Sequence, residues 1–143
     1  MLKKNILLAT VVLLSIYSVH AAADSMRNMG NQYGRMVLNF FMVEHLQQKC
    51  TDLRSVTIQD KTKVDELLRS KVDSEVHAAM MAQMADSGIE EVAQSQVKEI
   101  WSKLDGCDDP RLESVLGFIE KSHAEAFNNL EKIAVPKGAS KAQ

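Results

Sequence analysis

The chain has 143 residues, with 25% charged and 45% hydrophobic residues and a formal net charge of −2 at pH 7. That length suits one domain with a modest core. The mild acidity comes with no cluster of Lys and Arg, which excludes nucleic acid and an anionic membrane surface as the expected partner.

Residues 1–21 have the layout of a secretory signal peptide. A short basic start precedes an apolar run over residues 6–19, and the small residues Ala21, Ala22 and Ala23 follow it. A membrane anchor would need about 20 apolar residues, and this run is shorter. We therefore expect cleavage after Ala21, with Ala22 and Ala23 as alternative sites, and a periplasmic or secreted protein without stable membrane anchoring. Losing Lys3 and Lys4 brings the formal charge to about −4.

Residues 26–50 are predicted to form a long helix, because apolar residues recur there at steps of three and four. Its apolar face consists of Met29, Tyr33, Met36, Phe40, Val43, Leu46 and Cys50. A mostly polar linker is expected over residues 51–60.

Two more helices are predicted after this linker. The first covers residues 62–85, and its apolar stripe includes Met80 and Met84. Ser87 stands three residues before Glu90, which is the spacing of a capping box that starts a new helix. This third helix is expected to run to about residue 104, with Gly106 marking its C-terminal end.

A fourth helix is predicted after Asp109, which can cap its N-terminus, with Pro110 at the first helical position. Its apolar stripe consists of Leu112, Val115, Leu116, Ile119, His123, Phe127, Leu130 and Ile133. Four amphipathic helices joined by short loops predict an all-α antiparallel up-down bundle. We expect one domain over residues 22–135 and a flexible tail over residues 136–143.

Cys50 and Cys107 are the two cysteines of the chain. In an exported protein such a pair usually forms a structural disulfide. The up-down order also brings both thiols to the same end of the predicted bundle. A bridge that closes a loop of about 57 residues stabilises the fold by about 4 kcal/mol on the chain-entropy model.

Methionines gather in the stretch AAMMAQMA of the second predicted helix, and the first helix begins at the same end of the bundle. Such a cluster can fill irregular gaps in a core, offer an adaptable surface to a partner, or bind Cu(I) through its thioethers. Met81 lies off the apolar stripe and is expected at the exposed flank. The residues expected to border a partner-binding surface are Met29, Met81 and Met84, with Glu90 and Glu91 as its charged rim.

Histidine offers the remaining cofactor hypothesis. His123 follows Glu120 by three residues, but di-iron bundles need two such motifs, so a histidine packed in the core is the simpler interpretation. The alternative to a core histidine is a metal-binding pair of His77 and His123, or a haem held by Met and His ligands. No nucleophile motif or phosphate-binding loop is present in the sequence, so we expect no catalysis and no cofactor.

The segment 86–125 carries ten acidic and four basic residues. This imbalance is typical of a solvated face, and it can also attract a basic partner. The sequence thus predicts a small exported binding protein of the inhibitor, immunity or chaperone type that acts through another protein. A periplasmic copper- or haem-binding bundle is the alternative, and a homo-oligomer remains open.

Overall fold

The computed structural model describes the backbone of residues 2–134 and the side chains of residues 22–134. Over this range it contains five helices and no strand, which confirms the all-α prediction. The helices are α1 (Leu2–Lys49), α2 (Lys61–Arg69), α3 (Ser74–Ala85), α4 (Ile89–Trp101) and α5 (Pro110–Lys132). The expected tail, residues 136–143, lies outside the described residues, as do the side chains of the expected signal peptide.

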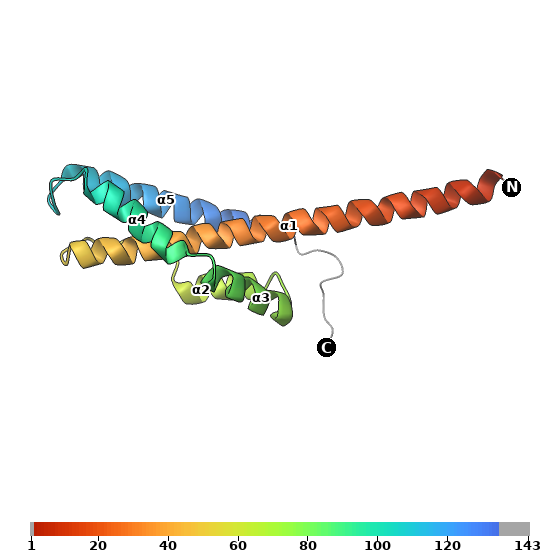
Figure 1. Ribbon diagram of the computed structural model, residues 1–143, viewed down its shortest axis with the longest axis horizontal. Coiled ribbons are helices and arrows are strands. Elements are labelled where there is room, and N and C mark those ends of the chain that lie inside the picture. The colour runs from red at the N-terminus through yellow and green to blue at the C-terminus, as the bar shows by residue number, and fades with distance from the viewer. Residues whose placement is uncertain (1, 135–143) are drawn as a thin grey trace.

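The C-terminal half of α1 is the central element of the fold (Figure 1). α5 runs back along α1 in the opposite direction, and α4 runs toward the same end of the molecule as the end of α1. In this view α4 and α5 lie above α1, whereas α2 and α3 lie below it. The N-terminal part of α1 extends beyond the other helices.

Two core clusters follow one another along α1. One joins the end of α1 to α4 and α5 and consists of Met42, Val43, Leu46, Cys50, Ala93, Val97, Leu112, Leu116 and Ile119. The other joins the middle of α1 to α2 and the end of α5 and consists of Met29, Met36, Val64, Leu68, Ala126 and Leu130. The apolar stripes predicted for the first and last helices are therefore the buried faces of α1 and α5.

The single helix predicted over residues 62–85 is wrong, because the structure divides this segment into α2 and α3. Asp73 accepts a hydrogen bond from the Val76 amide at 2.9 Å and so caps a new helix. Lys71 lies in the loop between these two helices. Its ammonium donates to the main-chain oxygens of Glu131 and Ile133 at 2.6 and 3.0 Å. A lysine thus caps the C-terminal end of α5, where helix carbonyls lack partners.

The capping box predicted at Ser87 is also wrong. Gly88, with φ of 67°, is the N-cap of α4 and makes no side-chain cap hydrogen bond. The Ser87 hydroxyl instead donates to the Met84 carbonyl at 2.6 Å, at the end of α3. At Gly88 the chain passes from α3 to α4 through a left-handed conformation, which glycine adopts without strain.

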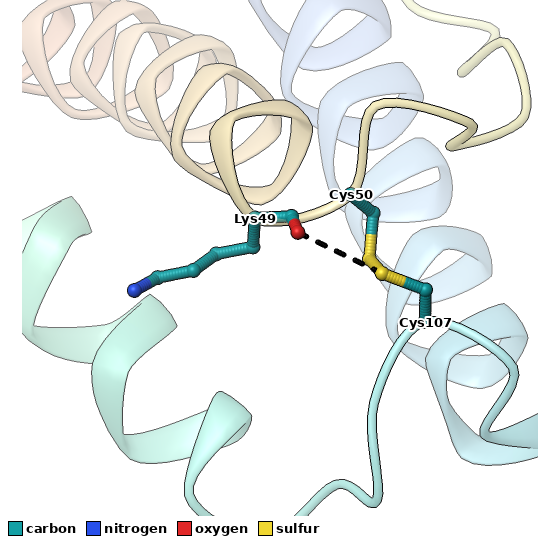
Figure 2. Close-up of a disulfide and its surroundings, with 3 residues drawn as sticks. All are labelled: Lys49, Cys50 and Cys107. Atoms are coloured by element: carbon teal, nitrogen blue, oxygen red, sulfur yellow. Dashed lines mark hydrogen bonds between the residues drawn. A yellow bond between two sulfur atoms is a disulfide. The ribbon is translucent and has the colours of Figure 1, made fainter.

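The disulfide between Cys50 and Cys107 is confirmed, with their Cα atoms 5.7 Å apart (Figure 2). Cys50 is 2% exposed and belongs to the core, whereas Cys107 lies in the exposed loop between α4 and α5. The Cys107 sulfur lies 3.7 Å from the Lys49 main-chain oxygen. The bridge therefore joins the last turn of α1 directly to the loop that precedes α5.

Candidate functional site

The methionines of α1 and α3 lie together, as the sequence predicted. Met29 is in the buried cluster of α1, and Met26, Met80 and Met81 pack against that cluster. Met26, Met80 and Met84 also line one groove between α1, α3 and the start of α4. Side chains distant in sequence thus form one thioether-rich region.

Two glycines of α1 face the ends of the methionines of α3. A methyl group added at Gly30 would lie 3.9 Å from Met80 Cε. A methyl group added at Gly34 would lie 3.5 Å from Met84 Cε and 3.9 Å from its sulfur. The ends of both methionine side chains therefore rest on a part of α1 that has no side chains of its own.

The groove beside these contacts has a volume of about 590 Å³. Its apolar lining comes from Met26, Gly30, Gly34, Leu38, Met80, Met84, Ile89 and Val92. The polar lining residues are Arg27, Asn31, Gln83 and Ser87. Val92 is 46% exposed, which is unusual for a large apolar side chain of this fold. The volume falls in the range of pockets that bind small molecules or peptide side chains.

The structure places the predicted site residues in four different environments. Met84 lines the groove, whereas Met29 is 0% exposed and lies beneath it in the core. Met81, expected at the exposed flank, is half-buried, and its sulfur accepts a hydrogen bond from the Tyr33 hydroxyl at 3.5 Å. Glu90 and Glu91 are exposed in the first turn of α4, where the helix dipole favours negative charge.

His77 is held by a carboxylate rather than by a second histidine. Its Nε2 lies 2.7 Å from Asp65 Oδ1, and the other oxygen of Asp65 accepts from Arg69 at 2.7 Å. The hydrogen bond from Arg69 holds the pKa of Asp65 below its usual value, and the bond to His77 adds to this effect. His77 is the one buried residue of α3, so this contact fixes the start of α3 to α2.

His123 is 1% exposed and packs edge-on against Phe40, with ring centroids 5.0 Å apart. Neither ring nitrogen has a hydrogen-bond partner among the described residues. Burial lowers the pKa of His123 below its usual value, and the nearby main chain of Gln59 partly opposes this shift. The environment thus favours a neutral core histidine.

Glu120, the other member of the Glu-x-x-His motif, holds the linker onto α5. Its carboxylate accepts from the Arg54 guanidinium at 2.8 Å and from the Thr57 amide at 2.7 Å. Arg54 also bonds Glu113 at 2.7 Å. These contacts lower the pKa of Glu120 to about 2, with the Arg54 hydrogen bond as the largest cause. Within residues 22–134, no three His, Cys, Asp or Glu side chains are grouped as metal ligands.

Comparison with known proteins assigns the chain to no family. No family model, no curated protein and no solved structure matches it. Among the residues whose side chains are described, no helix is long and apolar enough to cross a membrane. The groove therefore has to be interpreted from its own chemistry.

Sequence reasoning missed the residues of α1 and α4 that shape the groove. Gly30 and Gly34 stand four residues apart, which places them on one helical face and was the available signal. Ile89 and Val92 continue the apolar spacing of the third predicted helix, which favours burial in the core, and the structure places them in the groove wall instead. A period of 3.6 identifies an apolar face but not whether a neighbour covers it.

Proposed function

We propose that the protein binds an apolar segment of another protein in the groove formed by α1, α3 and α4, and acts without catalysis. The observation that carries the proposal is the groove wall itself, whose lining includes Met26, Met80, Met84 and the partly exposed Val92. Methionine side chains repack at little cost, so such walls accept apolar side chains of varied shape.

Charge at one end of the groove favours a partner with a basic flank. Asp86, Glu90 and Glu91 are exposed around the junction of α3 and α4. Other acidic residues between 86 and 125 are engaged within the chain, among them Glu99 with Lys103 and Glu113 with Arg54. Apart from the exposed Asp108 in the loop before α5, the acidic residues of this segment that are left for a partner lie beside the groove, where they speed encounter with a basic segment.

We also propose export, with cleavage after Ala21. The disulfide is compatible with an oxidising compartment, where such bonds persist. In the mature protein α1, α4 and α5 would form a bundle in which α5 runs antiparallel to the other two, with α2 and α3 packed beside α1. An inhibitor, an immunity protein or a chaperone fits this design. The intact mass of protein recovered from its host tests cleavage, and residues 1–21 retained on the recovered protein would contradict it.

Substitution of Val92→Glu tests the groove. Val92 is 46% exposed, so the change should alter thermal stability little, yet it places an uncompensated carboxylate in the apolar wall. We expect affinity capture from the host's extract to lose one specific protein with V92E and to retain it with Asn128→Glu, a matched change at an exposed site of α5. Equal capture by both variants would contradict the proposal.

A further inference from the structure

α3 is attached to the rest of the molecule by very few contacts. His77 is its one buried residue, and the bond to Asp65 fixes only its first turns. Beyond His77, its contacts with α1 are made by methionines: Met80 over Gly30, Met81 with Tyr33, and Met84 over Gly34. The attachment of the C-terminal half of α3 therefore depends on thioether side chains.

These methionines differ in how solvent reaches their sulfur atoms. Met80 and Met84 are half-buried and line the open groove. Met81 does not line the groove, and its sulfur accepts a hydrogen bond from the Tyr33 hydroxyl at 3.5 Å, whereas the nearest hydroxyl to the Met84 sulfur is that of Ser87 at 3.9 Å. Met29 and Met36 are 0% exposed and Met42 is 5% exposed. The described residues thus include two methionines that line the groove, one that is bonded to Tyr33 and others that are buried in the core.

We propose that Met80 and Met84 are a peroxide-sensitive latch, whose oxidation to sulfoxides releases α3 from α1. In this reaction a lone pair of the thioether sulfur attacks one oxygen of a peroxide, the O–O bond breaks and an S–O bond forms. Sulfur loses two electrons, and the second peroxide oxygen takes up the proton and leaves as water or, from an organic peroxide, as an alcohol. The product is a polar sulfoxide in place of an apolar thioether.

The site itself explains why this change should open the latch. The sulfoxide oxygen is a strong acceptor, but the facing surface of α1 consists of Gly30 and Gly34, which have no side-chain donors. The amides of these glycines lie inside α1, where the helix uses them for its own hydrogen bonds. A sulfoxide can satisfy its oxygen only away from these two glycines, with water or with the side-chain donors of the groove (Arg27, Asn31, Gln83 and Ser87), so it must turn from the glycine surface into the groove. The contacts of Met80 and Met84 with α1 are then lost together. The inference concerns the protein with an open groove and does not require that the groove bind a partner.

The test uses the full disulfide-bonded protein and limiting hydrogen peroxide. Peptide mass spectrometry should find Met80 and Met84 oxidised roughly tenfold faster than Met29 and Met36, because susceptibility follows exposure. Met26 should also oxidise early, but it belongs to α1 and does not hold α3. Hydrogen exchange should then rise within residues 78–87 and stay unchanged in α5.

Two double variants separate the latch from general oxidative damage. Met80→Leu with Met84→Leu keeps the apolar contacts at similar volume, so peroxide should no longer raise exchange in α3. Met29→Leu with Met36→Leu should respond as the wild type does. Complete oxidation of Met80 and Met84 without faster exchange in α3 would overturn the proposal. An equal rise in the M80L/M84L variant would overturn it as well. If the M80L/M84L variant does not fold, the wild type alone tests the proposal. Oxidation of Met80 and Met84 must then precede the rise of hydrogen exchange in α3, and the reverse order would overturn the proposal.

Discussion

At the scale of single residues, the clearest feature is a histidine kept neutral by its surroundings. His123 is packed against Phe40 with no hydrogen-bond partner for its ring nitrogens among the described residues. The periodicity of α5 predicted that it would be buried, and the structure confirms this. Whether a buried histidine finds a partner depends on other elements, so the sequence alone left a metal or haem interpretation open.

Stability should therefore fall as the pH falls through the range in which free histidine titrates. The pKa of folded His123 is lowered from 6.5, so below about pH 6.5 the unfolded chain binds a proton that the folded chain does not. His123→Phe should make the melting temperature less dependent on pH between about pH 7 and pH 5. Calorimetry over this range measures the effect. Equal slopes for H123F and wild type would show that His123 is not the cause.

At the scale of helices, the sequence predicted which faces are buried better than where helices begin. Asp109 caps α5 with Pro110 in its first turn, as predicted, because both signals are local. The break before α3 was missed because Asp73 interrupts a segment whose apolar spacing continues across it. Periodicity alone cannot distinguish one helix from two helices that share a phase.

Glycine substitutions test the junction between α3 and α4. Gly88 has φ of 67°, so Gly88→Ala should destabilise the fold by about 1–2 kcal/mol, the cost of a left-handed conformation with a Cβ. Gly117 is a control within a helix, and a Cβ added there meets nothing within 4 Å. Gly117→Ala should stabilise by about 0.5–1 kcal/mol. Urea unfolding compares the two variants, and a neutral G88A would contradict this account of the turn.

At the scale of the whole molecule, the disulfide and the methionine region lie apart along α1. Fifteen residues separate Gly34 from Lys49, which corresponds to about 22 Å of helix. One end of the fold is thus cross-linked, while the other is held by flexible side chains. The cysteine pairing was predictable because two cysteines allow one intramolecular bridge. The groove was not, since it depends on the separation between helices.

Removing the bridge should cost more than any single substitution proposed above. Cys50→Ala with Cys107→Ala should lower the free energy of unfolding by about 4 kcal/mol, because the unfolded chain regains the freedom of a long loop. Cys50 is also 2% exposed, so some packing is lost in addition. Denaturant unfolding of the variant and of the reduced wild type should agree. A loss below about 1 kcal/mol would contradict the entropic account.

The same bridge changes how the chain reaches its folded state. Phe40 and His123 are in contact but lie 83 residues apart along the backbone. Counted through the bridge, ten residues lead from Phe40 to Cys50 and sixteen from Cys107 to His123. The search that joins α1 to α5 is therefore a short-range search in the oxidised chain and a long-range one in the reduced chain. Oxidation before folding should speed refolding, so the compartment that forms the bond would also set the pace at which α5 finds α1.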